Sequence, residues 1–305
     1  MLIILLNILI ILIVPFLMIG MIKKTKAFWS GRKGVSIFQP LWDFLKLMKK
    51  NAVYSKTSSW VFRFAPIVTF SSIIFASLFV PLINGQAVIN LQFSFIIFAY
   101  ILALGKFFSL LGALDTGSSF EGMGASREAC FSTIVEPAFF IAMASIAALS
   151  QNYSFACLKN ILDGAGIYGY LIIILTAFTL FIMLLIEGCR VPVDDPTTHL
   201  ELTMIHEVMI LDNSGVDLGF ITWGAAIKMF LFISLIINLV LPADLSLGLA
   251  TSLFLILAAL LSIIIGTVES AFARFRMTHV FEFIFIMSLT ALLILALVTY
   301  RLYGN

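Results

Sequence analysis

The chain has 305 residues, of which 62% are hydrophobic and 11% are charged, and its formal net charge is +2. A soluble domain is only about half apolar, whereas here uncharged runs of about twenty residues, long enough to cross a bilayer, recur along the sequence. The composition therefore excludes a soluble enzyme and a nucleic-acid-binding domain. Lipid offers the backbone no hydrogen-bond partners and the runs show little strict alternation, so we predict an all-α membrane protein, one polytopic domain spanning residues 1–305.

The first predicted span covers residues 2–21 and is followed by Lys23, Lys24 and Lys26. A signal peptide carries its positive charges before the apolar run and a small-residue cleavage site after it. Here the positive charges follow the apolar run. This order predicts a segment that is not cleaved and stays in the membrane as an anchor, with the N-terminus outside.

Residues 22–63 contain ten of the eighteen lysines and arginines and a single acid, Asp43. This excess of positive charge predicts a cytoplasmic loop. Within it, apolar residues recur at helical spacing while Asp43 and Lys46 lie on the other face. The apolar positions are Leu41, Phe44, Leu45 and Met48. The pattern predicts an amphipathic interfacial helix. It could be a general membrane-surface helix, or it could bind a cytoplasmic partner or narrow the mouth of a chamber.

Seven further spans are predicted, which makes eight: 64–83, 91–114, 131–150, 169–188, 220–241, 246–267 and 280–300. With an outside N-terminus, the cytoplasmic loops are 22–63, 115–130, 189–219 and 268–279. They hold fourteen of the lysines and arginines. We therefore expect a multi-pass protein of the cytoplasmic (inner) membrane with both termini outside.

Six ionisable residues lie within or beside the spans: Lys106, Glu136, Glu187, Lys228, Glu269 and Glu282. A charge at the bilayer centre costs about 2.5–3.5 kcal/mol on insertion scales, so each needs a partner, water or a function. All six fall in the cytoplasmic half, whereas a self-contained transporter needs polar groups along its whole path. The asymmetry predicts a hydrated chamber that is open to the cytoplasm and passes protons sideways to another subunit, unless these charges only satisfy their neighbours.

The loop at 115–130 carries several glycines but no GxxxxGK pattern, so phosphate binding is a poor interpretation. Arg127 and Glu128 are expected to begin the next helix. From there they could pair with the acids of residues 187–215.

Residues 187–215 read EGCRVPVDDPTTHLELTMIHEVMILDNSG. The seven charges in this stretch are Glu187, Arg190, Asp194, Asp195, Glu201, Glu207 and Asp212. Glu187 and Arg190 can share a helix face, and Glu201 follows Thr198 at the spacing of a capping box. The stretch is expected to form a polar loop and short helix at the membrane surface.

Cysteines and histidines give little sign of a metal centre. The cysteines at 130, 157 and 189 form no CxxC pair, and no histidine lies in the middle of a span, where a haem would need it. His199 and His206 are seven residues apart on one face, but a metal site needs a further ligand that the sequence does not supply. Protonation of these histidines, coupled to the nearby acids, is the favoured interpretation.

Five motifs together resemble one family. They are GRKGVSIFQPLWDFLKL (31–47), SSWVFRFAPIV (58–68), DTGSSFEGMGASRE (115–128), EP (136–137) and the polar stretch at 187–215. The chain resembles the membrane subunit shared by group 4 membrane-bound nickel–iron hydrogenases, including the formate hydrogenlyase type, and by respiratory complex I (the NADH-quinone oxidoreductase), where the equivalent subunit lines the quinone chamber. The second and third motifs are closer to the hydrogenase branch, and VDDPTTHLEL departs from the complex I form of this loop, which leaves a quinone site open.

The resemblance implies a non-redox subunit that docks a redox arm to the membrane and couples electron transfer to proton translocation. It implies docking through Asp194, Glu201 and Glu207, with Arg190 beside them, and relay through buried carboxylates at 128, 136 and 187. The full predicted relay set adds Lys106, Arg127, Arg190, Lys228 and Glu269, and the full docking loop adds Asp195, His199, His206 and Asp212. The implied partners are hydrogenase-like large and small subunits, an iron–sulfur subunit and antiporter-like membrane subunits. Iron–sulfur clusters and any nickel–iron centre would belong to those partners, and none to this chain.

Three alternatives stay open. The chain could line the quinone site of an NADH-quinone oxidoreductase, act alone as a proton or sodium transporter, or serve only as a structural anchor.

Overall fold

The structure is a computed structural model that describes residues 2–83, 85, 87–155, 158, 167–195, 204–242 and 245–303. Over these ranges the chain is helical and contains no strand. Eight of the helices described are long and apolar enough to cross a membrane: α1 (Leu2–Trp29), α3 (Trp60–Ser77), α4 (Ser94–Asp115), α5 (Ser119–Ser150), α7 (Ile167–Glu187), α8 (Gly215–Val240), α9 (Leu247–Ala271) and α10 (Met277–Tyr303). The prediction of an all-α protein with eight spans is confirmed.

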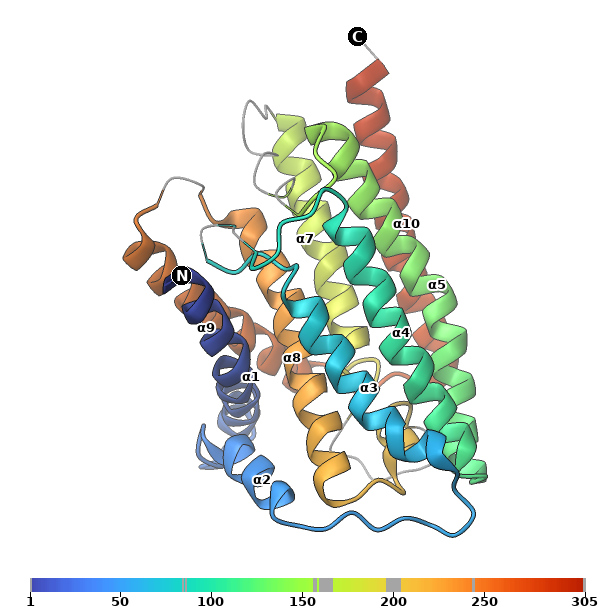
Figure 1. Cartoon of the computed structure of the whole chain (residues 1–305). Helices are drawn as coiled ribbons and strands as arrows, with labels where there is room; N and C mark the ends of the chain where they lie inside the picture. Colours follow the sequence, from blue (N-terminus) through green and yellow to red (C-terminus); the bar gives the residue numbers. More distant parts are fainter. Residues whose placement is uncertain are drawn as a thin grey trace.

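Helix α8 is the centre of the bundle. It contacts α1, α2 (Gln39–Met48), α3, α7 and α9, and nearly all of its side chains from Ala226 to Leu239 are buried. A helix that is apolar on all sides is expected to be buried in this way. Around it, Figure 1 shows α4, α5, α7 and α10 on one flank and α1 and α9 on the other.

The short helix α2 runs beside the ends of α1 and α8, where the sequence predicts an amphipathic helix. Pro40 lies in its first turn, a position that proline favours. The ring of Phe44 packs on Phe16 of α1 and on Trp223 of α8, with centroid distances of 5.3 and 4.7 Å. On this helix the Lys46 side chain stays exposed, and Asp43 accepts a hydrogen bond from Gln39 at 2.8 Å.

Helix α5 begins at Ser119, so most of the expected loop at 115–130 is helical and only residues 116–118 are not. Hydropathy marks the apolar part of this helix, whereas its polar first turns are held by packing. A Cβ atom at Gly124 would lie 2.8 Å from Cγ of Met209 in η1 (Glu207–Ile210), so the glycine permits close approach. Arg127 and Glu128 are therefore well inside a helix and do not begin one.

Helix α3 is shifted toward the N-terminus relative to the predicted span at 64–83. It starts at Trp60 because Ser59 caps it: the Ser59 hydroxyl accepts from the Val61 N–H at 3.1 Å. Asp115, at the end of α4, accepts from the N–H groups of Ser59 and Phe62 at 2.7 and 3.3 Å. The helix ends at Ser77, four residues before Pro81.

One end of the bundle holds α2, η1 and the loops between α7 and α8 and between α9 and α10; we name it the charged end. Both chain termini lie away from α2 (Figure 1). The amino ends of α3, α5 and α8 and the carboxyl end of α7 also lie at the charged end (Figure 1).

Candidate functional site

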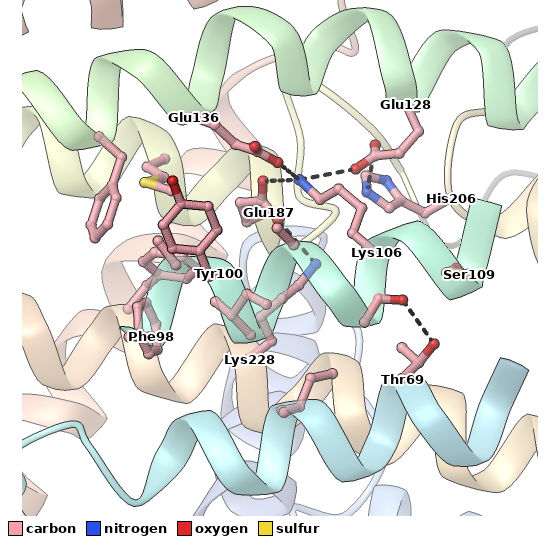
Figure 2. A pocket seen from close by; sticks show the side chains of 18 of the residues that line it. Thr69, Phe98, Tyr100, Lys106, Ser109, Glu128, Glu136, Glu187, His206 and Lys228 are labelled. Atoms are coloured by element: carbon pink, nitrogen blue, oxygen red, sulfur yellow. Dashed lines mark hydrogen bonds and ion pairs between the residues drawn. The ribbon is translucent and has the colours of Figure 1, made fainter. Parts of the chain in front are cut away.

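A buried lysine of α4 lies at the centre of the candidate site. The Nζ atom of Lys106 is 2.7 Å from Oε1 of Glu187 and 3.0 Å from Oγ of Ser132. Oε1 atoms of Glu136 and Glu128 lie 3.4 and 3.5 Å away. Figure 2 shows the three carboxylates converging on the ammonium group. This opposite charge offsets the cost of holding a cation inside a membrane-spanning bundle.

A second lysine shares one of these carboxylates. Nζ of Lys228, in α8, lies 3.1 Å from Oε2 of Glu187, at the end of α7. Each oxygen of Glu187 therefore faces a different ammonium group. The arrangement ties α4, α7 and α8 together through one buried carboxylate.

The α5 contribution comes from one face of that helix. Glu128, Ser132 and Glu136 are spaced four residues apart, so they lie above one another on the side that faces Lys106. Ser132 was not predicted as a site residue, although this spacing is readable from the sequence. Its hydroxyl lies between the levels of the two glutamates and hydrogen-bonds with the lysine.

A histidine from the loop before α8 continues the network toward the charged end. Nε2 of His206 lies 3.1 Å from Oε2 of Glu128, and Nδ1 lies 3.4 Å from Oδ2 of Asp194. The same Asp194 oxygen accepts from the backbone N–H groups of Ile205 and His206 at 3.2 and 3.0 Å. Its other oxygen lies 3.2 Å from Nη2 of Arg274.

These contacts set the ionisation of the loop residues. Burial opposes the charge on His206, but the neighbouring Cys189 sulfur and the carboxylates of Glu128 and Asp194 outweigh it and raise the pKa of His206 well above its ordinary value. Burial also opposes ionisation of Asp194, but hydrogen bonds from His206 and the charge of Arg274 hold the pKa of Asp194 below its ordinary value. At neutral pH the two groups therefore form a charged pair.

Together these contacts make a continuous path. It runs from Arg274 through Asp194, His206 and Glu128 to Lys106, and every step is 3.5 Å or shorter. From Lys106 it branches to Glu187 and Lys228 in the interior and to Glu136 at the flank of α5. The Glu136 side chain is 40% exposed, whereas those of Glu128 and Glu187 are 7% exposed. The path thus connects the charged end with the side of the bundle.

A cavity of about 140 Å³ lies against this path. Figure 2 shows side chains that line it, among them the charged groups of the path, and phenylalanines of α4, α5 and α8 form an apolar part of the lining. These phenylalanines are Phe98, Phe139, Phe140 and Phe232. A single water needs roughly 10–15 Å³ of such volume and two to four polar partners, so the cavity has room for several waters.

Three residues predicted for the relay, Arg190, Glu269 and Arg127, lie off this path. Arg190 was expected to share a helix face with Glu187, but α7 ends at Glu187 and the chain turns through Cys189, whose φ is 54°. Arg190 instead lies 3.3 Å from Glu269 of α9, whose carboxylate also pairs with Lys26 of α1 at 3.0 Å. We name these three residues the Glu269 group.

Arg127 was expected to pair with the acids of the polar stretch. Part of that stretch, including Glu201, lies outside the described residues, so this pairing stays a prediction. Within the described residues the Arg127 guanidinium donates to the backbone carbonyl of Met204 at 2.8 Å, which anchors the loop before His206 to α5. Glu282, counted in the sequence with the chamber, has a side chain that is 72% exposed, and it pairs with His279 at 3.0 Å on the surface.

The remaining described docking-loop residues belong to the same segments of the chain as Asp194 and His206. Asp195 donates its N–H to Asp194 at 3.0 Å, Glu207 begins η1, and Asp212 is exposed. The predicted His199 and Glu201 lie outside the described residues. Over the described part of the chain, no three His, Cys, Asp or Glu side chains come together in a way that could hold a metal ion.

Two further residues of the site had no sequence signal of function. Arg274 was counted only as a positive charge in a loop, and its contact with Asp194 depends on how the loop before α10 folds back. Glu121, in the first turn of α5, is fully buried and accepts the N–H of Asp212 at 2.9 Å. It fixes the segment between η1 and α8.

Comparison with known proteins finds a family model and relatives that match most of the chain. The family model described as NADH dehydrogenase matches residues 1–300. Hydrogenase-4 component C of Escherichia coli (strain K12) is 31% identical over 274 residues, which are 88% of this chain and 86% of that protein. Formate hydrogenlyase subunit 4 of the same organism is 27% identical over 277 residues, 86% of each chain.

A solved structure agrees in fold. A chain in the structure of the membrane-bound sulfane sulfur reductase, an archaeal respiratory membrane complex, superposes with a TM-score of 0.78. The match covers 97% of this chain and 98% of that chain at 21% sequence identity.

Proposed function

Because the chain belongs to the NADH dehydrogenase family, we propose that it is the membrane subunit of a hydrogenase-like oxidoreductase. In this role it docks the redox arm and couples electron transfer to proton translocation, without a redox centre of its own. The observation that carries the proposal is the path from Arg274 to Glu136, which joins the charged end to the flank of the bundle.

The proposed orientation follows from charge. The charged end holds the loop of residues 22–63 with ten of the eighteen lysines and arginines, so it faces the cytoplasm of an inner membrane, and both termini face outside. Beyond the level of Lys106, the spans carry no Asp, Glu, Lys or Arg before Arg301 near the C-terminus. A stand-alone transporter would need polar groups there, so this asymmetry favours a subunit that hands protons sideways.

The path can transmit a change of charge because it alternates in sign. Four cations, counting protonated His206, face four carboxylates: Arg274, His206, Lys106 and Lys228 against Asp194, Glu128, Glu136 and Glu187. Unit charges about 3 Å apart interact by roughly 5 kcal/mol at an effective dielectric constant of 20. A proton gained or lost near Asp194 is therefore felt at Glu128, and from there at Lys106.

Glu136 supports a sideways exit. A carboxylate that is 40% exposed on the flank of a membrane-spanning helix would face lipid, which costs several kcal/mol if it is charged. A neighbouring membrane subunit that covers the flank of α4 and α5 removes this cost and offers the next site for the proton. We assign this place to an antiporter-like subunit.

The arm is proposed to dock at the opposite end of the path. Asp195 and Glu207 directly follow Asp194 and His206 in the chain, and the exposed Asp212 comes five residues after Glu207. An iron–sulfur subunit seated here would bring its electrons close to that pair, and hydrogenase-like large and small subunits would complete the arm. The clusters and the nickel–iron centre stay in those partners.

A quinone-lining role has less support. Pockets for drug-sized ligands span roughly 300–1,000 Å³, whereas the cavity on the path is about 140 Å³ and its lining includes charged groups. At the junction of α1, α2, α3 and α8, the rings of Phe16, Phe44 and Phe70 lie within 5.7 Å of Trp223, centroid to centroid, and fill the space. The residues present do not fit a prenylated quinone.

The test is proton translocation by the assembled complex in proteoliposomes. Glu136→Gln removes the charge at the flank while the exposed Glu282→Gln serves as the matched control. We expect Glu136→Gln to lower the ratio of protons moved to electrons transferred, with electron transfer itself retained. Full translocation in Glu136→Gln, or translocation by the purified chain alone, would contradict the proposal.

A further inference from the structure

A basic hollow lies at the charged end of α1 and is separate from the proton path. It has a volume of about 500 Å³ and is formed by the end of α1, the turn that follows and the end of α9. Its lining includes Lys26, Trp29, Arg32, Val35 and Ser270. Its position at the ends of two membrane-spanning helices is the depth at which lipid headgroups lie.

Close packing builds the walls of this hollow. Gly34 has a φ of +67°, and a Cβ atom there would lie 2.5 Å from Cβ of Ala27, so the turn lies directly on α1. A Cβ atom at Gly266 would lie 2.7 Å from Cβ of Thr25, so α9 approaches α1 closely enough to bring Ser270 to the hollow. The turn is closed by the Arg32 N–H, which donates to the Ala27 carbonyl at 2.8 Å.

The charge of the hollow is positive. Glu269 is shared by Lys26 and Arg190, so the Glu269 group keeps one net positive charge, and Lys26 is held at the wall. Arg32 and Lys33 are exposed, and no carboxylate within the described ranges forms an ion pair with either. The hollow therefore offers one oriented ammonium and one unpaired guanidinium to an anion.

The rim of the hollow is apolar. Trp29 is 61% exposed and Phe28 beside it is 76% exposed, while Phe272, next to the end of α9, is 54% exposed. Val35, which lines the hollow, is 47% exposed. A free phosphate or an acidic protein segment would leave these rings in water, whereas a phospholipid covers them with its acyl chains.

We propose that this hollow binds the phosphate headgroup of an anionic phospholipid of the phosphatidylglycerol class, with its acyl chains against Trp29 and Phe272. Basic pockets between membrane helices on the cytoplasmic side bind such headgroups. Arg32 contacts the phosphate and Lys26 supplies the second cation. The inference needs the membrane position of the chain and does not depend on the proton path.

The experiment uses the purified complex in nanodiscs of phosphatidylcholine with a minor fraction of phosphatidylglycerol. After annular lipids are removed with detergent, the retained phosphatidylglycerol per complex is counted by mass spectrometry. Arg32→Gln is expected to weaken the apparent affinity about fivefold, the effect of one surface cation. Lys50→Gln, an exposed lysine after α2 and outside the hollow, is the matched control and is expected to change nothing.

Three results would overturn the proposal. Arg32→Gln and Lys50→Gln could retain equal amounts of phosphatidylglycerol, or inorganic phosphate alone could displace the lipid fully from the wild-type complex. A photo-crosslinker at position 32 that captures a partner subunit and no lipid in the intact complex would assign the hollow to a protein interface. Because proton translocation is not measured, these results are distinguishable from failure of the proposed function.

Discussion

Two buried glutamates, Glu187 and Glu269, each bridge two lysine or arginine side chains, but among the described residues only Glu187 belongs to a longer path of ion pairs. Glu187 faces Lys106 and Lys228, and through Lys106 it joins a path that ends on the exposed Glu136. Glu269 faces Lys26 and Arg190, and its side chain is fully buried. The same ionic arrangement thus stands in two settings: beside a cavity at Glu187, where we propose that it couples charge to proton movement, and at Glu269, where it fastens the segment after α7 to α1 and α9.

The largest expected effect comes from Glu187→Gln. The neutral amide leaves Lys106 and Lys228 without the carboxylate that they share, and the alternation of charge along the path is lost. We expect proton translocation by the assembled complex to fall at least tenfold, and a factor of ten corresponds to about 1.4 kcal/mol. Electron transfer should persist. A pH-sensitive dye in proteoliposomes measures translocation, and unchanged translocation would show that Glu187 is only structural.

Glu269→Gln tests whether the Glu269 group and the path through Glu187 have different roles. It leaves Arg190 and Lys26 without their common carboxylate, and removing one partner of a buried ion pair costs about 3–5 kcal/mol. Because Lys26 is 27% exposed and water can take over part of its solvation, the loss should be near the lower end. We expect a lower midpoint of thermal unfolding with an unchanged ratio of protons to electrons, whereas normal stability with lost translocation would make Glu269 part of the path.

A smaller effect is expected from pH. The raised pKa of His206 means that its charged pairs with Glu128 and Asp194 stabilise the fold fully below its unfolded value of about 6.5. This stabilisation is lost as pH rises through the higher folded pKa.

His206→Gln should therefore lower the thermal midpoint most at mildly acidic pH, and the difference from the wild type should narrow in alkaline buffer. The measurement is thermal unfolding of the complex at a series of pH values. A difference that stays constant with pH would mean that His206 acts through packing and not through its charge.

The smallest expected effect is that of Tyr54→Phe, which lies outside both regions. The Tyr54 hydroxyl donates to Asp217 at 2.8 Å, and partial burial together with Asp217 raises the pKa of Tyr54. Losing one hydrogen bond at a partly exposed site costs about 1 kcal/mol. We expect a small drop in the thermal midpoint and normal translocation. A large loss of translocation would show that the path extends to the start of α8.

The sequence could predict much of the site because membranes make charge rare. Lys106, Glu136, Glu187 and Lys228 stand out in apolar runs, and their common depth implies a shared chamber, which the structure shows for these residues. The partner of Arg190 could not be predicted in the same way. The spacing to Glu187 suggests an ion pair along a helix, but the helix stops, and the turn through Cys189 sends Arg190 to α9.

The full length of α5 could not be predicted from the sequence either. Hydropathy locates the apolar run at 131–150, whereas the polar residues before it are helical because Gly124 lets η1 pack directly on α5. The contact of Arg274 with Asp194 likewise joins two loops that are distant in sequence. Such contacts depend on how loops fold onto a finished bundle, which residue spacing does not encode.

Lys106 and Lys228 hold Glu187 together, one ammonium group at each carboxylate oxygen. Because each carboxylate oxygen is held by its own ammonium group, losing one of these contacts still leaves Glu187 paired with the other. In the coupling role proposed above, Glu187 would therefore act as a latch that responds only to a change of charge large enough to detach one ammonium group.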